Sequence, residues 1–260
     1  MRNDECIIGV EELYTQFGNH VVHENINLCV WHGEVLTLVG GSGSGKTALM
    51  RQMLGLETPA RGTVRVFGEP LRGRNREKLQ GMRNRCGVLF QKGALFSALS
   101  VYDNIALPMR ELRTLDESKI RDLVMLKLEM VEIEPRHAHK MPAELSGGMI
   151  KRIALARAMA LDAELLFLDE PTAGLDPELS EGFVKLIKTM RKELTLTIVM
   201  ATHDLDTLVA LSDRVAVLAD QRLVALGTLR EVINTPHPFI TNFFHGERGR
   251  KTLENNSGVS

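Results

Sequence analysis

A glycine-rich loop that follows an apolar run constrains this chain more than any other feature. The apolar run, Val35–Val39, has the composition of a buried strand, and the residues after it match the pattern G-x-x-x-x-G-K-[ST]. These residues are Gly40, Gly41, Ser42, Gly43, Ser44, Gly45, Lys46 and Thr47. A helical pattern begins at Lys46, and a strand, such a loop and a helix together form a phosphate-binding loop. The alternative, a glycine-rich surface loop without a ligand, does not account for this context.

The residue types in this loop suit a nucleoside triphosphate. Glycine adopts positive φ without strain, so the backbone N–H groups can point inward at phosphate oxygens. The helix that starts near Lys46 adds the positive end of its dipole to the same anion. We expect Lys46 to bridge the β- and γ-phosphates and the Thr47 hydroxyl to bind Mg²⁺.

Strand-length apolar runs alternate with helical patterns along the 260 residues, which is typical of an α/β fold with a parallel sheet covered by helices. The predicted strands are Val35–Val39, Thr63–Phe67, Cys86–Phe90, Leu165–Leu168, Thr197–Ala201, Val215–Leu218 and Arg222–Leu226. The predicted helices are Lys46–Gly55, Asp116–Val131, Gly147–Leu161, Glu178–Leu194 and Leu205–Leu211. Between Lys92 and Ala160 no strand pattern occurs, so we expect a helical insert there.

Composition excludes several other classes of protein. Lys and Arg number 32 and Asp and Glu 33, so the net charge of −1 gives no basic footprint for nucleic acid. The cysteines Cys6, Cys29 and Cys86 are odd in number and form no Cys-x-x-Cys pair, so we expect thiols and no disulfide framework. Neither a secretory signal nor an apolar stretch of about 18–20 residues is found, which favours a cytoplasmic protein that reaches a membrane only through a partner.

A second chemical feature is the apolar run Glu164–Leu168 followed by two carboxylates, Asp169 and Glu170. In an α/β sheet the carboxyl ends of buried strands lie where ligands bind. Asp169 is therefore expected to hold Mg²⁺, directly or through water, and Glu170 to polarise the attacking water. Any strand may end in acids, but together with a phosphate loop the pair predicts nucleotide hydrolysis.

The string Leu145–Met149 resembles the signature of ATP-binding-cassette (ABC) ATPases, normally Leu-Ser-Gly-Gly-Gln, with Met149 in place of the glutamine. Ser146, Gly147 and Gly148 at a helix start offer a hydroxyl and bare N–H groups, a second anion site. An ordinary helix cap is the alternative. The resemblance implies that this surface serves the ATP of the opposite subunit, so that two chains enclose two ATP molecules head to tail.

Further positions match this family, which implies a P-loop fold with a RecA-like core, an antiparallel β subdomain and a helical signature subdomain. The resemblance identifies Gln91 as the glutamine that contacts Mg²⁺ and the water and links to a transmembrane partner. It identifies His203 as a γ-phosphate contact and Phe17 as the aromatic that stacks on adenine. A capping or core histidine and a core aromatic are the alternatives for these two. The ATPase domain is expected over residues 7–240, with the helical subdomain at about 92–160 and a tail at 241–260.

Within the family, Gly93–Phe96 and Met149 are similar to the ATPases of Mla-type lipid transporters. That resemblance implies a homodimer on the cytoplasmic side of the inner membrane of a Gram-negative bacterium, moving phospholipids to maintain outer-membrane asymmetry. It implies an MlaE-type permease docked near Gln91–Pro108 and an MCE-class lipid-binding protein, and it allows a small cytoplasmic accessory subunit. No nucleic-acid partner is expected.

Three other functions stay open at this point. An importer of a polar solute, such as an amino acid, would use the same chemistry with a different permease. Soluble ABC proteins that act on DNA, ribosomes or cluster assembly usually carry two cassettes, a coiled-coil insert or zinc cysteines, which this sequence lacks. A non-catalytic binding module is disfavoured because every catalytic position holds the expected residue type.

Overall fold

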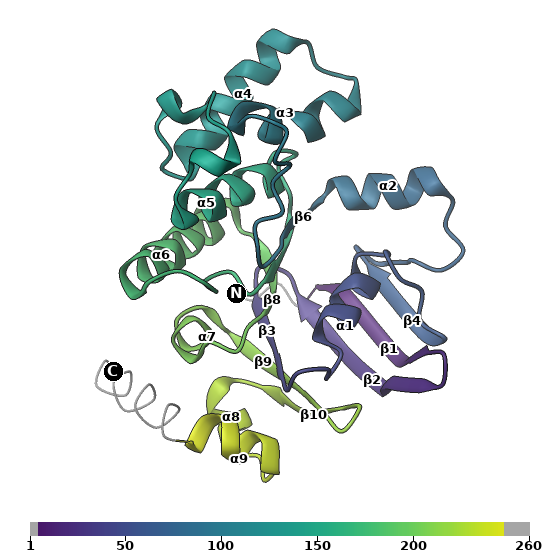
Figure 1. Cartoon of the computed structure of the whole chain (residues 1–260). Helices are drawn as coiled ribbons and strands as arrows, with labels where there is room; N and C mark the ends of the chain where they lie inside the picture. Colours follow the sequence, from purple (N-terminus) through teal and green to yellow (C-terminus); the bar gives the residue numbers. More distant parts are fainter. Residues whose placement is uncertain (1–4, 247–260) are drawn as a thin grey trace. The chain divides into compact units, whose positions relative to one another are not determined.

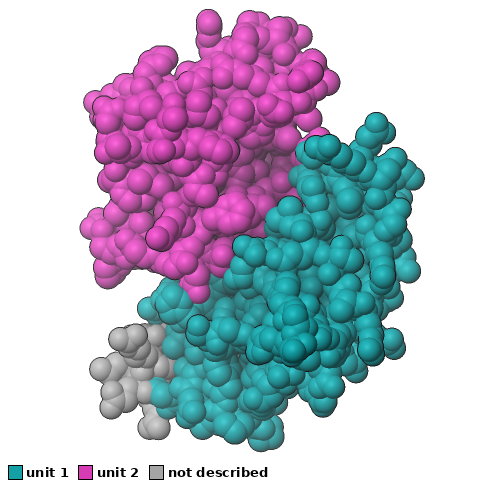
Figure 2. Space-filling view, turned by 45° about the vertical axis from the view of Figure 1, so that its right-hand side comes forward, with its two compact units in different colours: residues 1–83, 197–260 teal, residues 84–196 magenta. Residues whose placement is uncertain are grey.

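The structure, a computed structural model, describes residues 5–246 (Figure 1). The chain forms two compact units, shown in teal and magenta in Figure 2. Unit 1 consists of residues 1–83 and 197–260, and unit 2 consists of residues 84–196. Each unit is described in turn. None of the helices within the described residues has both the length and the apolar character needed to span a lipid bilayer.

Unit 1 contains an antiparallel sheet of four strands in the order β2-β1-β4-β5. The strands are β1 (Cys6–Phe17), β2 (His20–Trp31), β4 (Arg61–Val66) and β5 (Glu69–Pro70). Strands β1 and β2 form a long hairpin that turns at Gly18, which has a positive φ of 56°. This sheet is the antiparallel subdomain that the family resemblance implies.

Cys6 and Cys29 form a disulfide within this sheet, so the expectation that these two cysteines are thiols was wrong. They lie on the neighbouring strands β1 and β2, with Cα atoms 5.8 Å apart, inside the range that a disulfide requires. Cys86 is a half-buried thiol, and burial raises its pKa to about 12.

The second set of strands in unit 1 has the order β10-β9-β3-β8. These are β3 (Val35–Gly40), β8 (Thr197–Ala201), β9 (Arg214–Ala219) and β10 (Arg222–Gly227). Strand β3 lies between β8 and β9 and is parallel to both (Figure 1). Every residue of β8 and nearly every residue of β3 is buried, as expected for parallel strands covered on both faces.

The helices of unit 1 are α1 (Lys46–Met53), α2 (Arg76–Asn84, whose last residue belongs to unit 2), α7 (Leu205–Leu211), α8 (Leu229–Ile233) and α9 (Pro238–His245). A hydrophobic cluster joins α7, α8 and α9 to strands β3 and β9, with Ile240 and Phe244 of α9 fully buried in it. Residues 241–245 of the expected tail therefore continue α9. Residues 247–260 of that tail lie outside the described residues.

Unit 2 pairs two parallel strands, β6 (Cys86–Leu89) and β7 (Leu165–Asp169), and is otherwise helical. Its helices are α3 (Val101–Leu112), α4 (Glu117–Met130), α5 (Gly147–Ala158) and α6 (Pro177–Leu194), with 3₁₀ turns at Pro135–His137 and Pro142–Glu144. Residues 92–160, all of them described, contain helices and turns and no strand. Helix α3 was not predicted, and it contains Pro108, a residue that usually interrupts helices.

The sequence of α6 explains why it is the longest helix described. Asp176 caps its start by accepting a hydrogen bond from Leu179 N at 3.0 Å, and Pro177 occupies the first turn, where no N–H partner is needed. Phe183, Ile187 and Met190 recur at spacings of three and four, so one face is buried.

Phe183→Ala should destabilise the folded protein by about 3–5 kcal/mol, because it removes a ring that is only 1% exposed and leaves a cavity. Leu194→Ala, on the same helix but 46% exposed, is the matched control and should change stability by about 0.5 kcal/mol at most. Urea denaturation followed by circular dichroism measures both. Equal losses for the two variants would contradict the assignment of the buried face.

Candidate functional site

The phosphate loop of unit 1 has the conformation that its glycines predict. Gly43 and Gly45 have positive φ values of 79° and 92°, and Gly45 is the residue from which α1 begins. The ammonium group of Lys46 donates to the carbonyls of Gly40 at 2.8 Å and Gly41 at 3.1 Å, so it lies across the loop. The Ser44 hydroxyl is buried and has no hydrogen-bond partner among the described residues. An unsatisfied buried hydroxyl in such a loop fits a phosphate oxygen.

A buried histidine lies against this loop, and the sequence analysis did not single it out. His23 of β2 is fully buried, and its Nδ1 is 2.9 Å from the Thr15 hydroxyl, which in turn lies 3.1 Å from Gln52 Oε1 of α1. A side chain at Gly45 would overlap the His23 ring. Burial lowers the pKa of His23 to about 4, so the imidazole is neutral at pH 7.

Two other predicted site residues of unit 1 are exposed. His203 lies two residues after the end of β8, and the next residue, Asp204, caps α7 by accepting a hydrogen bond from Thr207 N at 3.0 Å. Strands β3 and β8 are parallel neighbours. The phosphate loop after β3 and His203 after β8 therefore lie at the same edge of the sheet. Phe17 ends β1 and is 50% exposed, which fits a stacking surface better than the alternative of a core aromatic.

Unit 2 places the predicted carboxylates and Gln91 at a second such edge. Leu89 of β6 pairs with Leu168 of β7 in parallel register, so Asp169, the last residue of β7, and Gln91, two residues after β6, both lie at the carboxyl ends of these strands. Asp169 and Glu170 are partly buried, and Gln91 is exposed. Glu170 has a φ of 49°, in the left-handed region that a non-glycine residue occupies at a cost of about 1–3 kcal/mol. Such strain is concentrated at functional sites.

The signature segment begins helix α5. The exposed Ser146 caps the helix, and its hydroxyl accepts a hydrogen bond from Met149 N at 3.3 Å. Gly147 has nothing within 4 Å of the position of a side chain, whereas Gly148 is buried beside Leu179 of α6. A serine, a glycine and the positive end of a twelve-residue helix at the surface are suited to bind an anion.

Lys151 of α5 connects the segments of unit 2 that contain Gln91 and Glu170, and the sequence analysis did not identify it. Its ammonium group is buried and donates to the backbone carbonyl of Gln91 at 2.5 Å and to that of Glu170 at 3.0 Å. Burial lowers its pKa, and attraction to the carboxylates of Glu170 and Asp169 offsets part of that shift. Its position three residues after the buried Gly148 could have revealed it, since a lysine on a buried helical face needs partners.

The segment after Gln91 is held by side chains rather than by regular structure. Arg157 of α5 donates to the carbonyls of Gly93 at 3.1 Å and Ala94 at 2.8 Å, and its guanidinium lies 5.5 Å from the Phe96 ring centroid. Phe96 remains 53% exposed. The fully buried Asn104 of α3 accepts from Phe96 N and donates to the carbonyls of three residues. These are Phe96, Leu99 and Ser100.

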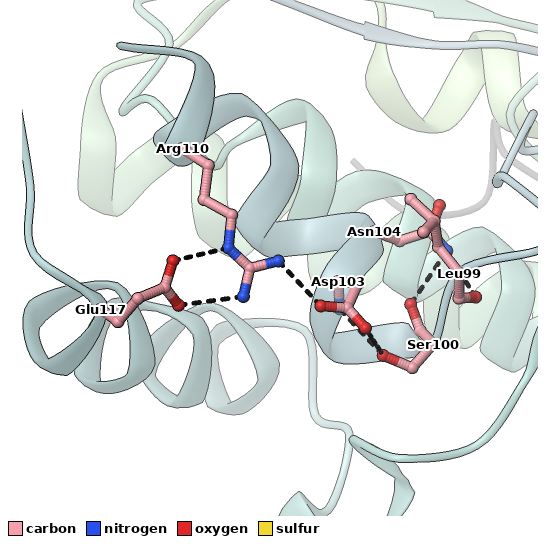
Figure 3. Close-up of polar contacts among 6 residues, drawn as sticks. All are labelled: Leu99, Ser100, Asp103, Asn104, Arg110 and Glu117. Atoms are coloured by element: carbon pink, nitrogen blue, oxygen red, sulfur yellow. Dashed lines mark hydrogen bonds and ion pairs between the residues drawn. The ribbon is translucent and has the colours of Figure 1, made fainter. Parts of the chain in front are cut away.

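Figure 3 shows how the start of α3 continues this network. The Ser100 hydroxyl donates to Asp103 at 2.6 Å. Arg110 donates to Asp103 at 2.8 Å and to both carboxylate oxygens of Glu117 on α4, so it links the two carboxylates. The hydrogen bonds from Ser100 and Arg110 lower the pKa of Asp103. The exposed Phe96 thus lies on a segment whose backbone is fixed from α3 and α5.

The predicted site residues divide between the two units. Unit 1 holds the phosphate loop, Phe17 and His203; unit 2 holds Gln91, Asp169, Glu170 and the signature residues 146–148. The expected ligands for Mg²⁺, Thr47, Gln91 and Asp169, all offer oxygen atoms, the donors that this ion prefers.

Comparison with known proteins identifies ATP-binding proteins of transporters. The ABC transporter family matches residues 23–173. The intermembrane phospholipid transport system ATP-binding protein MlaF of Haemophilus influenzae is 38% identical over 244 residues, covering 94% of this chain and 92% of that protein. The probable ribonucleotide transport ATP-binding protein mkl of Mycobacterium leprae is 36% identical over 241 residues, covering 93% of this chain and 69% of that protein.

A solved structure is similar over most of the chain. The dimeric ATP-binding cassette MJ0796, in a post-hydrolysis state bound to ADP and Pi, has a TM-score of 0.78 at 27% identity. The similarity covers 86% of this chain and 99% of that one. It extends the agreement from sequence to the arrangement of helices and strands.

The lowered pKa of His23 predicts a pH dependence of stability. Between pH 6.5 and about 4 the unfolded chain protonates this imidazole and the folded chain does not, so stability falls as pH falls through this window. His23→Leu should remove that contribution, about 1.4 kcal/mol per pH unit. Urea denaturation at several pH values compares the slopes of the two proteins. Parallel profiles would show that His23 is not held neutral.

Proposed function

Because the chain belongs to the ABC transporter family, we propose that it is the ATP-hydrolysing subunit of a transporter that moves phospholipids between membranes. The observation that carries the proposal is the 38% identity to an intermembrane phospholipid transport ATPase along nearly the whole length of both chains. The P-loop ATPase fold and the family resemblance inferred from sequence are confirmed by the same comparisons.

In unit 1 the phosphate loop binds the triphosphate. Backbone N–H groups of the loop and the start of α1 face the phosphate oxygens, and Ser44 gains a partner for its buried hydroxyl. Lys46 exchanges the carbonyls of Gly40 and Gly41 for the β- and γ-phosphates. Phe17 stacks on adenine, and His203 contacts the γ-phosphate.

In unit 2 the carboxylates act on the water and the metal ion. Glu170 polarises the attacking water, and Gln91 contacts the same water. Asp169, Gln91 and Thr47 would hold Mg²⁺, which would supply positive charge against the negative charge that develops on the phosphates. Ser146, Gly147 and Gly148 complete the site of a second copy of the chain, as the resemblance to ABC ATPases implies and as the dimeric state of the similar cassette supports.

A membrane permease docks on the segment that includes Gln91–Pro108. The exposed Phe96 offers an apolar contact, and hydrogen bonds from Arg157 and Asn104 hold the backbone of this segment. Closure of the dimer on ATP and its reopening after hydrolysis then move the permease. The proposed partners are an MlaE-type permease and an MCE-class lipid-binding protein, on the cytoplasmic side of an inner membrane.

Lys46→Ala should abolish ATP hydrolysis, because no other cation of the loop bridges the phosphates. Glu170→Gln should lower kcat by about 10²–10⁴-fold while ATP still binds, so that ATP-bound dimers accumulate. Turnover assays with size-exclusion chromatography measure both. Normal turnover of either variant would remove that residue from its proposed role.

The transported substrate is tested by purifying the tagged protein from detergent-solubilised native membranes and identifying proteins and lipids by mass spectrometry. A polytopic permease with an MCE-class protein and phospholipid is the expected result. The relative named as a ribonucleotide transport protein favours the second candidate, a transporter of a polar solute. Recovery of a permease with a polar-solute binding protein would select that candidate, and recovery of cytosolic proteins alone would reject transport.

A further inference from the structure

A single buried side chain in unit 2 touches the backbone of two residues that the proposed reaction uses. Lys151, only 4% exposed, donates to the carbonyl of Gln91 at 2.5 Å and to the carbonyl of Glu170 at 3.0 Å. It lies on α5, five residues after the signature Ser146. One ammonium group therefore joins three segments of the chain, those that follow β6 and β7 and the helix that begins at the signature.

The contact with Glu170 acts at a strained point of the backbone. Glu170 has a φ of 49°, and such a conformation persists only where the surroundings fix it. Its carbonyl accepts two hydrogen bonds, from Lys151 and from Ala173 N at 3.2 Å. The φ angle of a residue sets the direction of its side chain relative to the strand, so the carboxylate direction depends on these bonds.

The contact with Gln91 acts on a similar turn. Gly93 N donates to Phe90 O at 2.8 Å, and Gly93 has a positive φ of 73°. Lys151 holds the Gln91 carbonyl inside this turn, and Arg157, also on α5, holds the carbonyls of Gly93 and Ala94. Backbone in turns of this kind has no ladder partners, so the two cations of α5 supply its hydrogen bonds.

We propose that Lys151 is a positioning residue for ATP hydrolysis, which fixes Glu170 and Gln91 relative to each other and to the signature helix. This inference rests on the proposed function, in which Glu170 and Gln91 act on the attacking water. In this role Lys151 acts through the backbone carbonyls of Gln91 and Glu170, to which it donates its hydrogen bonds. ATP affinity, which the phosphate loop of unit 1 provides, is independent of it.

Lys151→Met tests the inference in the full-length protein, since methionine keeps the length of the side chain and removes the donor. Its kcat should fall by about 10- to 100-fold, because small misplacements of reacting groups have effects of this size. The dissociation constant for ATP should stay within about twofold. Lys151→Arg, which keeps a buried donor, should recover most of the kcat.

The matched control is Lys127→Met. Lys127 of α4 lies in the same unit, is 2% exposed, and pairs with Asp162 at 2.5 Å. The Lys127→Met variant should lose thermal stability and keep the kcat of wild type. Equal loss of kcat in Lys127→Met and Lys151→Met, or unchanged kcat in Lys151→Met, would overturn the positioning role.

Amide hydrogen exchange gives a second measurement that does not depend on turnover. The amides of Gly93 and Ala173 close the two turns, and both should exchange at least about tenfold faster in Lys151→Met than in wild type or Lys127→Met. If wild type itself hydrolyses no ATP, the proposed function fails, and exchange still decides whether Lys151 holds the turns. Unchanged exchange at both amides would overturn the inference.

Discussion

Parallel strands that are buried on both faces determine where this protein can carry polar groups. The side chains of β3, β7 and β8 are almost entirely apolar and buried, so no ligand can reach them along the strands. Apart from the buried Thr37 and Thr197, polar residues lie at or after the carboxyl ends of these strands. In unit 1 these are the phosphate loop and His203, and in unit 2 they are Gln91, Asp169 and Glu170. Each unit therefore presents its chemistry along one edge of its parallel strands.

The turns at these edges need hydrogen bonds that regular structure does not provide. In unit 1 glycines accept the positive φ angles, and His23 fills the space under Gly45. In unit 2 the turns after β6 and β7 contain Ala94 and Glu170 at positive φ, and cationic side chains of α5 bind their carbonyls or those nearby. The second solution ties both turns to one helix, α5.

Local patterns in the sequence predicted those features of the fold that depend on residues close together along the chain. The glycine spacing of the phosphate loop and the apolar runs of β3, β7 and β8 identified the fold class, because backbone conformation and burial follow from residue type there. Helix α3 was missed because Pro108 resembles a helix break.

Contacts between distant segments were beyond the reach of the same patterns. The disulfide between Cys6 and Cys29 depends on the pairing of β1 and β2, and spacing along the chain carries no information about it. The partners of Lys151 lie 60 and 19 residues away, on turns whose position only the fold determines. His23 was overlooked for the same reason, since its neighbour Gly45 is adjacent in space and not in sequence.

The contact between His23 and Gly45 has a consequence for the variation that this sequence can tolerate. The two positions share one volume, because the imidazole occupies the space that a side chain at position 45 would need. A smaller residue at position 23 would open a cavity under the loop, and a larger one would press on the start of α1. Positions 23 and 45 are in contact, so substitutions at the two sites have effects that do not simply add. Strand β2 thus restricts what can stand at the last glycine of the loop, in addition to the φ of 92° that itself opposes a side chain there.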